Sequence, residues 1–514
     1  MKQGHKARVE KWLPLVLVVV CAAQPVLDAA GYWQNILGMS NVITFSIRII
    51  ILAATGLAGF LLSERKGLYF AAAGLIALVF CGHIFACIRN GGFPSTTDIS
   101  GWVRILAFPV TTICMITFVR NCTGAYEAMR KGIALAFLII VLIMLIATLT
   151  GTDHHTYATS KTGVLGWFMW PNTQSAILSI SAPVAISWAL KRWKKELLPV
   201  FVVTAVSLGC LYVFGTRLAY ASMAAAGLGV GITLWASDRG RRKQACVIIG
   251  LTAIFIALYP VSPMTNNLDR IADRTEEKIA RVDAMLDKYS VSDELLRAID
   301  RGEAEVTDDV RKSLENIYVG YVPGMMDHFG VDRTIAEYHY TADVTVLSNV
   351  RQQKIMFCEM LMEDAGLPSK LFGLDVEKMH VERMLHLNTT IGKWEIGEGY
   401  YDVENDTWGM YFLGGIAGFV LSMLFLFYFG FRILANLLRN WKKYFNNEIG
   451  ALGVAYCCAV VHIIFTASLL RRNNGSFYLS VVIAMLMAIT DPIFPLKKKE
   501  VPESAQMAER EQII

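Results

Sequence analysis

The chain has 514 residues, of which 54% are hydrophobic and only 18% are charged, and its formal net charge is +5. A soluble protein of this length usually carries about a quarter charged residues and divides into several domains. The composition therefore excludes an ordinary soluble enzyme, and the charge gives no indication of a nucleic-acid partner.

The apolar residues gather in long runs, close to the roughly 20 residues that cross the hydrocarbon core of a membrane as a helix. The first run follows a basic segment, as in a signal peptide, but no convincing cleavage site follows it and more runs come at once. We therefore predict an all-α polytopic membrane protein with about twelve transmembrane helices. The runs are 13–30, 43–62, 68–88, 102–119, 132–150, 174–190, 197–214, 218–236, 246–262, 407–431, 451–470 and 476–490.

Lysine and arginine mark every second connection between these runs, as well as the N-terminal segment. In contrast, residues 31–42 contain neither, and residues 151–173 contain only Lys161. Because cytoplasmic connections carry the excess of positive charge, we expect both termini to be cytoplasmic and the other connections to face outward. The basic connections are 63–67, 129–132, 191–195, 238–243 and 439–443.

The pattern divides the chain into four parts. Residues 1–262 hold transmembrane helices 1–9, 263–405 form a large extracytoplasmic loop, 406–490 hold helices 10–12, and 491–514 form a cytoplasmic tail. The loop contains more than half of the aspartate and glutamate of the chain. It is therefore an acidic domain outside a basic, cytoplasm-facing belt.

The large loop is predicted to be folded and mostly helical. Residues 268–289 repeat apolar side chains near helical spacing. Ser292 and Thr307 are capping residues followed by acids, which is typical of a helix start. A solvated helical cap without chemistry explains residues 268–320 well.

Six arginines, Arg89 among them, break the charge pattern by lying toward the outer side. An ionisable group at membrane depth is costly unless it is paired or faces a water-filled cavity. Arg217 separates two runs that meet with almost no connection, so we expect it to face a cavity. For Arg48 and Arg104, an internal salt bridge is as good an explanation as substrate contact, and Arg471 and Arg472 could bind lipid phosphate. Together the guanidinium groups point to an anionic ligand of the diphosphate type.

No pattern in the sequence indicates a metal site or a cofactor. The chain has no C-x-x-C pair, and nine of its ten cysteines lie in or beside apolar runs. His154 and His155 are adjacent and so point in different directions, and Asp153 alone does not complete a ligand set. We expect no metal and no cofactor.

Three segments around the large loop carry a family resemblance. The first is "GWFMWPNTQSAILSISAPVAISWAL" (166–190), with a Pro-Asn turn that leads into a run, and the second is "FGTRLAYASMAAAGLGVG" (214–231). The third extends from "NVRQQKIMFCEMLMEDAGLPSKLFGLDVE" (349–377) to "VENDTWGMYFLGGIAGFVL" (403–421). In this order they resemble the O-antigen ligase and O-antigen polymerase superfamily of bacterial membrane glycosyltransferases, over about residues 160–435.

The sequence departs from the family pattern at three points. Thr216 stands in place of the serine of the Ser-Arg-Gly-Ala-type helix start. Ile355 or Phe357 lies near the place of the tryptophan in the loop helix. Glu404 stands where ligases commonly carry histidine. These departures leave ligase versus polymerase open, and they weaken the transfer of a histidine-based mechanism.

The resemblance implies an enzyme that transfers a glycan from an undecaprenyl-diphosphate-linked donor to an acceptor on the outer side of the bacterial cytoplasmic membrane. This is a step in surface polysaccharide biosynthesis and the cell envelope. The implied partners are the polyprenyl-diphosphate-linked donor, a glycan or lipid-linked acceptor, and membrane lipids. Neither a metal nor a general acid is required, because a lipid diphosphate is a good leaving group that arginines can neutralise.

Read against that reaction, Glu404 is the candidate base, with Asp402 as the alternative. Arg217 and Arg351 would hold the diphosphate, helped by Arg471 or Arg472. The remaining candidate substrate-binding residues are Asn405, Arg48 and Arg104. For Glu404 and Asp402, a helix cap is the competing explanation, because acids at a helix start favour the helix dipole.

Two other functions remain open. A transporter or flippase for a lipid-linked or anionic substrate would share the spans and the intramembrane arginines, although no internal repeat is visible. A non-catalytic assembly or sensor protein would use the loop as a binding module, and its arginines would then be dispensable.

Overall fold

In a computed structural model, residues 3–491 are described except 159, 389–392 and 402. Each of the twelve predicted runs contains a helix, although α9 and α20 end five residues before their runs do, and ten of these helices are long and apolar enough to cross a membrane. The other two are the shorter apolar α7 and the 16-residue α9. The helices are α1 (Gln3–Ile36), α2 (Val42–Leu62), α3 (Lys66–Arg89), α4 (Thr96–Asn121), α5 (Ala125–Leu149), α6 (Pro171–Arg192), α7 (Leu198–Phe214), α8 (Arg217–Ser237), α9 (Arg242–Ala257), α18 (Asp406–Arg439), α20 (Asn447–Phe465) and α21 (Asn473–Thr490).

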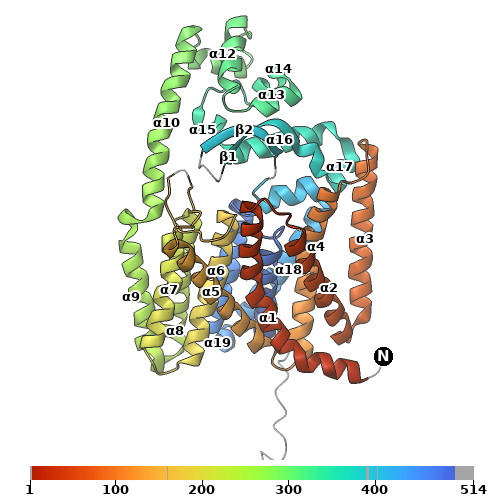
Figure 1. The fold of residues 1–514 in the computed structure, drawn as a ribbon, viewed down its shortest axis with the longest axis vertical. Coiled ribbons are helices and arrows are strands. Elements are labelled where there is room, and N and C mark those ends of the chain that lie inside the picture. Colours follow the sequence, from red (N-terminus) through yellow and green to blue (C-terminus); the bar gives the residue numbers. More distant parts are fainter. Residues whose placement is uncertain (1–2, 159, 389–392, 402, 492–514) are drawn as a thin grey trace, which may run out of the picture.

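The bundle has a buried centre and a lipid-type surface. Helices α6 and α21 are almost wholly buried, whereas α2 and α3 expose many apolar side chains at the edge. The middle of α6 reads "SAILSISAPVAIS", and such small residues let neighbouring helices approach closely. The hydroxyls of Ser179 and Ser181 are satisfied within the helix, since they donate to the Ser175 and Ile177 carbonyls at 2.7 and 2.8 Å. The N-terminus lies at the end of the bundle opposite α10 to α17 (Figure 1).

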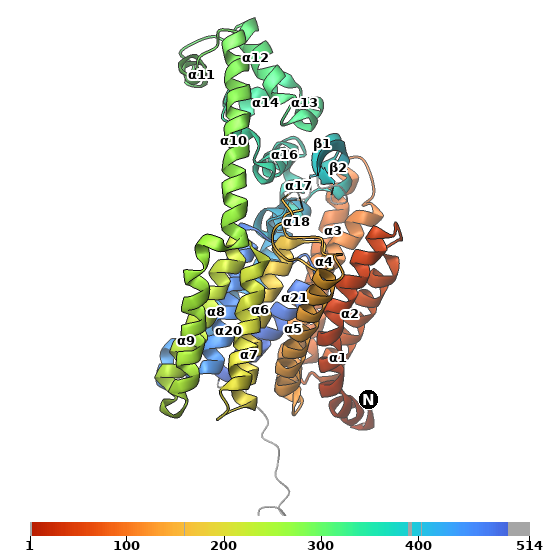
Figure 2. The same ribbon diagram turned by 60° about the vertical axis from the view of Figure 1, so that its left-hand side comes forward.

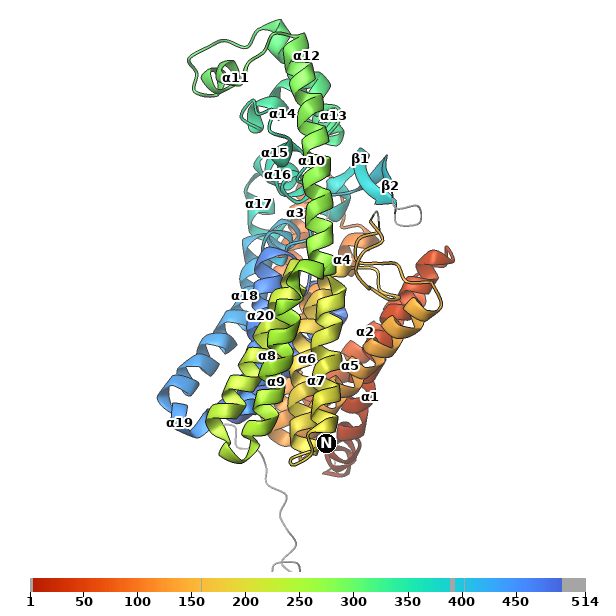
Figure 3. The same ribbon diagram turned by 90° about the vertical axis from the view of Figure 1, so that its left-hand side faces the viewer.

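The described part of residues 263–405, predicted to face outward and called the external domain below, stands on one end of the bundle, and α10 rises above α9 (Figures 2 and 3). The predicted helix starts are confirmed: the Ser292 hydroxyl accepts from the Leu295 amide, and the Thr307 hydroxyl accepts from the Val310 amide. The helices are α10 (Pro263–Lys288), α11 (Asp293–Asp300), α12 (Asp308–Tyr318), α13 (Pro323–Phe329), α14 (Val331–Glu337), α15 (Val344–Leu347), α16 (Val350–Asp364) and α17 (Gly366–Phe372). Short helices also occur at Arg239–Arg241, Tyr259–Val261, Val376–Met379 and Trp441–Tyr444 (α19).

The domain also contains a feature that the helical prediction missed. Strands β1 (His380–Asn388) and β2 (Lys393–Tyr400) form an antiparallel hairpin in which His380 pairs with Tyr400. The register shifts between Val381 and Met384, as in a β-bulge.

A kink in α18 fastens the external domain to the bundle. Gly415 has φ +61°, and a Cβ atom there would lie 2.3 Å from the Leu371 carbonyl carbon at the end of α17. Only glycine combines this backbone conformation with so close an approach. The Phe412 carbonyl beside the kink accepts the Leu374 amide at 2.8 Å, so the helix break is used to bind the loop.

Candidate functional site

A cavity of about 1030 Å³ lies where the ends of the membrane helices meet the external domain. Its walls come from the starts of α6, α8 and α10, from α16, and from the segments before α18 and α21. All the connections that meet here were predicted to face the same side of the membrane. The charged side chains among the described lining residues are four cations and one carboxylate: Arg217, Arg351, Lys354, Arg472 and Glu404.

Glu404 lies two residues before α18 and is the carboxylate of this cavity. Its Oε2 accepts a hydrogen bond of 3.3 Å from Asn172 and lies 4.0 Å from Arg351, and its Oε1 lies 3.9 Å from Lys354. The side chain is 44% exposed. Its partners are thus cationic and polar side chains. Within the described structure Oε1 accepts no hydrogen bond, so this oxygen remains available to a ligand.

Helix α16 supplies the two cations nearest to Glu404. Arg351 and Lys354 are three residues apart, which places them on one face of the helix. Arg351 donates to the Phe465 carbonyl at 3.3 Å, and its buried Nε has no partner among the described residues. A buried unpaired donor costs about 1–3 kcal/mol, so an anion that binds this Nε would be favoured.

Arg217 begins α8 and lines the same cavity. Gly215, with φ +81°, makes the tight turn after α7, and the Thr216 hydroxyl caps α8 by accepting from the Ala219 amide at 3.1 Å. Within the described chain Arg217 makes no hydrogen bond or ion pair. Its charge acts on Tyr157: burial raises the pKa of that phenol, and Arg217 partly offsets the rise. The prediction that Arg217 faces a cavity is confirmed.

A buried network beneath the cavity fixes the start of α8. Ser175 of α6 lies 3.0 Å from the Thr216 hydroxyl and 3.0 Å from Nε2 of His462 on α20. The other ring nitrogen of His462 donates to the Cys458 carbonyl at 2.8 Å. Three membrane helices thus hold the turn that presents Arg217.

Arg472 lies between this cavity and a smaller one of about 160 Å³. Its guanidinium stacks on Trp170, 4.3 Å from the ring centroid, and both residues line both cavities. The smaller cavity also contains Arg48, which pairs with Asp28, and Arg104, which lies 5.6 Å from the centroid of Phe45.

Arg471 requires a correction, because it lines neither cavity. Its guanidinium is buried, pairs with the fully buried Asp406 at 3.2 Å, and donates to Ser468 at 2.9 Å and to the Val403 carbonyl. Gly409 makes room for it, since a Cβ there would lie 2.3 Å from the guanidinium carbon. Arg471 therefore fastens the start of α18 to the segment before α21, and the protein itself occupies the donors that we assigned to substrate.

The other predicted residues beside Glu404 differ in their placement. Asn405 is buried and caps α18, accepting from the Thr407 amide at 2.8 Å and donating to the Ile464 carbonyl. It does not line either cavity, so a direct contact with substrate has no support in the geometry. Asp402, the alternative base, lies outside the described residues.

Sequence reasoning missed two of the three residues that contact Glu404, namely Lys354 and Asn172. Lys354 could have been found from its spacing to Arg351 on one helix face. Asn172 belongs to the Pro-Asn turn that carried part of the resemblance, but no pattern in the chain indicates that it meets Glu404 from more than 200 residues away.

A bundle of membrane-length helices with a cationic cavity at one end defines a multi-pass membrane protein. The chain belongs to the family described as O-antigen ligase like membrane protein, whose model matches residues 10–491, nearly the whole chain. The match extends well beyond the segments that carried the resemblance. No match was found among curated proteins. Membership indicates a membrane glycosyltransferase-like role in surface polysaccharide synthesis, in a family that acts on lipid-linked glycans and membrane lipids.

Proposed function

We propose that the protein transfers a glycan from an undecaprenyl-diphosphate-linked donor to a hydroxyl group of an acceptor, on the outer side of the bacterial cytoplasmic membrane and without a metal ion. The observation that supports it is the single cavity lined by four cations and one carboxylate at the end of the bundle. With Glu404 ionised, these side chains still carry a net positive charge. A diphosphate held at the membrane surface by its lipid fits such a site.

The arginines bind the donor and stabilise the leaving group. Arg217 and the unpaired Nε of Arg351 contact the diphosphate, and Lys354 and Arg472 add positive charge on either side. As the bond between the sugar carbon and the phosphate oxygen breaks, its electron pair stays on the lipid diphosphate. Cations already in place for that charge lower the barrier without rearranging.

Glu404 is the general base. The acceptor hydroxyl binds at Oε1, gives its proton to the carboxylate, and its oxygen forms the new glycosidic bond to the sugar carbon. Asn172 holds Oε2 and so orients the carboxylate. Arg351 and Lys354, at 4.0 and 3.9 Å, stand too far to form tight hydrogen bonds with Glu404, so the base remains accessible. In this assignment Arg48 and Arg104 contact substrate from the smaller cavity, which opens on the other side of Arg472.

The test is transfer by purified full-length protein, with a labelled lipid-linked donor and an acceptor glycan. We expect Arg217→Ala and Arg351→Ala each to lower the rate by about 100-fold or more, as for removal of one charge-stabilising donor. Arg301→Ala is the matched control, because Arg301 is an exposed arginine of the external domain paired only at the surface with Glu303. Its rate should equal that of the wild type.

Two outcomes would contradict the proposal. Full activity of both cavity variants would show that the arginines are dispensable. Movement of the lipid-linked substrate across proteoliposomes, with no new glycosidic bond, would favour a transporter. Within the proposal, the product separates the two branches of the family: repeated extension of a lipid-linked chain indicates a polymerase, and attachment to a different acceptor indicates a ligase.

A further inference from the structure

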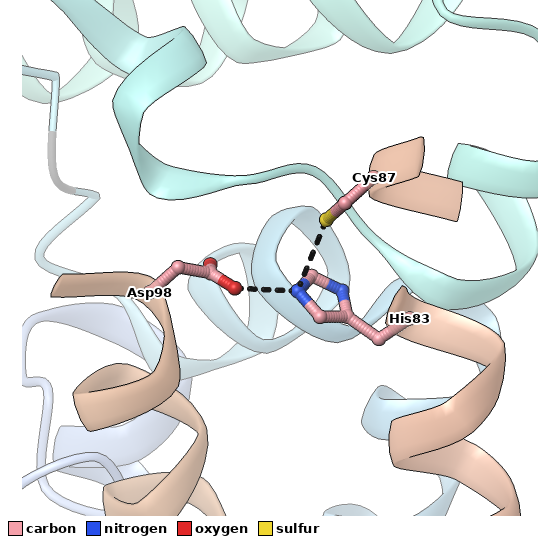
Figure 4. A group of neighbouring side chains, drawn as sticks. All are labelled: His83, Cys87 and Asp98. Carbon is pink, nitrogen blue, oxygen red and sulfur yellow. Dashed lines mark hydrogen bonds and ion pairs between the residues drawn. The ribbon is translucent and has the colours of Figure 1, made fainter. Parts of the chain in front are cut away.

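Three side chains with metal-binding atoms meet in a buried cluster, and none of them lines the cavity that contains Glu404 (Figure 4). His83 and Cys87 lie on α3, four residues apart, and therefore on one face of the helix. Asp98 lies in the first turn of α4. Nε2 of His83 is 2.6 Å from the Asp98 carboxylate and 3.4 Å from the Cys87 sulfur. All three residues are buried.

The hydrogen bonds of His83 indicate which of its ring nitrogens is available to a metal ion. Nδ1 lies 2.8 Å from the Phe372 carbonyl, which can only accept, so Nδ1 carries a hydrogen. In neutral imidazole Nε2 then presents a lone pair, and that lone pair faces the oxygen of Asp98. Two acceptors that face each other repel unless a proton lies between them or a metal ion binds both; at 2.6 Å only the proton fits, and a metal ion would move the two atoms to roughly 3.3 Å apart. A carbonyl that holds the far nitrogen is also the usual partner of a metal-binding histidine.

The surroundings orient the carboxylate in the same way. The second oxygen of Asp98 accepts the Val376 amide at 3.2 Å, and the Asp98 amide donates to the Ser95 hydroxyl at 3.1 Å. Ser95 in turn donates to Asp375 through its amide and its hydroxyl. The oxygen that faces His83 is thus held in place by groups from α4 and from the loop after α17, which is the role of the outer shell in metal sites.

We propose that His83, Cys87 and Asp98 bind a divalent metal ion of the zinc class. One thiolate, one carboxylate and one neutral imidazole balance its two positive charges, so the buried site is neutral when filled. Sulfur with nitrogen and oxygen ligands suits zinc, whose bonds to them are about 2.0–2.3 Å. These lengths require a nitrogen–sulfur separation of roughly 3.5 Å, close to the 3.4 Å observed, and a nitrogen–oxygen separation of roughly 3.3 Å, so the Asp98 carboxylate must move away from the His83 ring from its present 2.6 Å. Water completes the tetrahedron.

The site would act as a staple between the bundle and the external domain. It joins α3 to α4. His83 also bonds to the Phe372 carbonyl at the end of α17, and Asp98 accepts the Val376 amide from the segment that follows. Packing already brings these parts together, since a Cβ at Gly82 would lie 2.4 Å from the Phe372 ring. A metal here holds structure and takes no part in glycan transfer, so this proposal does not depend on the proposed function.

The experiment measures metal in the purified full-length protein after exposure to zinc and removal of loosely bound ions. We expect about one zinc ion per chain in the wild type and less than about a tenth of that in Cys87→Ser. Cys81→Ser is the matched control, because Cys81 is an exposed cysteine one turn and a half earlier on the same helix. It should bind zinc like the wild type.

Cobalt provides a readout that does not require a folded variant. Wild-type protein loaded with Co²⁺ should show a thiolate-to-cobalt charge-transfer band in the near ultraviolet, and a strong chelator should abolish it and lower the melting temperature. Equal zinc in wild type and Cys87→Ser, or bound cobalt without that band, would overturn the proposal. The cluster would then be a hydrogen-bonded group of His83, Cys87 and Asp98 that binds no metal.

Discussion

Arg471 and Arg472 are neighbours in the sequence, and their replacement should have opposite consequences. Arg471→Ala removes the partner of Asp406, which is fully buried, together with hydrogen bonds to Ser468 and to the Val403 carbonyl. The arginine itself is 7% exposed. Breaking a buried ion pair by removing one member costs roughly 3–5 kcal/mol, because the other charge is left without compensation. Such a loss is a large part of the stability of a typical protein.

Arg472→Ala should leave the fold nearly intact and impair function. Its stacking on Trp170 at the edge of two cavities is worth about 0.5–1 kcal/mol if the contact is solvated. Because its charge lies in the proposed donor site, the loss should appear in the rate of transfer.

Thermal unfolding of both variants in detergent, together with transfer activity per folded molecule, checks the pair. We expect a strongly lowered melting temperature for Arg471→Ala and a near wild-type one for Arg472→Ala. The combined variant Arg471→Met with Asp406→Leu should recover part of the stability, since it leaves no buried charge unpaired. If Arg471→Ala melts like the wild type and loses only activity, then Arg471 binds substrate and does not stabilise the fold.

Two further predictions concern the kink in α18 and an ion pair of the external domain. Gly415→Ala should destabilise the protein by about 3 kcal/mol or more, because it combines a strained φ with a Cβ 2.3 Å from Leu371; thermal unfolding measures this, and Gly453→Ala, with nothing within 4 Å, should stay within about 1 kcal/mol of the wild type. The two hydrogen bonds from Arg333, at 2.9 and 3.0 Å, lower the pKa of Asp364, so this carboxylate stabilises the fold above its ordinary pKa near 4, and the contribution is lost as the pH falls through the lower pKa of the folded state. Asp364→Asn should therefore lower the free energy of unfolding at pH 7 by well under about 1 kcal/mol, because the pair is exposed, and the melting temperature should fall slightly. The difference in melting temperature between the variant and the wild type should shrink below about pH 4. A difference that stays the same or grows there would contradict the link between this carboxylate and stability.

The membrane part of the fold could be predicted because its signals are local. A run of apolar residues specifies a membrane helix whatever lies next to it, and basic connections specify its direction. Helix starts at Ser292 and Thr307 were equally local, since a cap and its acids are adjacent in the sequence. The hairpin formed by β1 and β2 lacks such a signal, because two short strands at the surface need no strict alternation of apolar residues.

The candidate site could be predicted only in part, from arginines that lie at membrane depth on the outer side, where positive charge is not expected. That principle found Arg217 and Arg472, and with the resemblance also Arg351 and Glu404, and the structure places all four on one cavity. It could not separate Arg472 from Arg471, because the difference lies in Asp406 and Gly409 on another helix. Partners that come from distant segments, such as Asn172 for Glu404, are set by the tertiary fold alone.

If Glu404 is the general base in a cavity whose cations bind the donor, its negative charge is needed for transfer and is not needed for donor binding. The most direct test compares donor binding and transfer in Glu404→Gln, with Glu303→Gln as an exposed glutamate control on the same domain. We expect transfer to fall by about 100-fold or more, whereas the donor should bind at least as tightly, because a negative charge has left a cationic site. Wild-type transfer by Glu404→Gln would show that Glu404 is not the general base and serves only as a partner of Arg351 and Lys354.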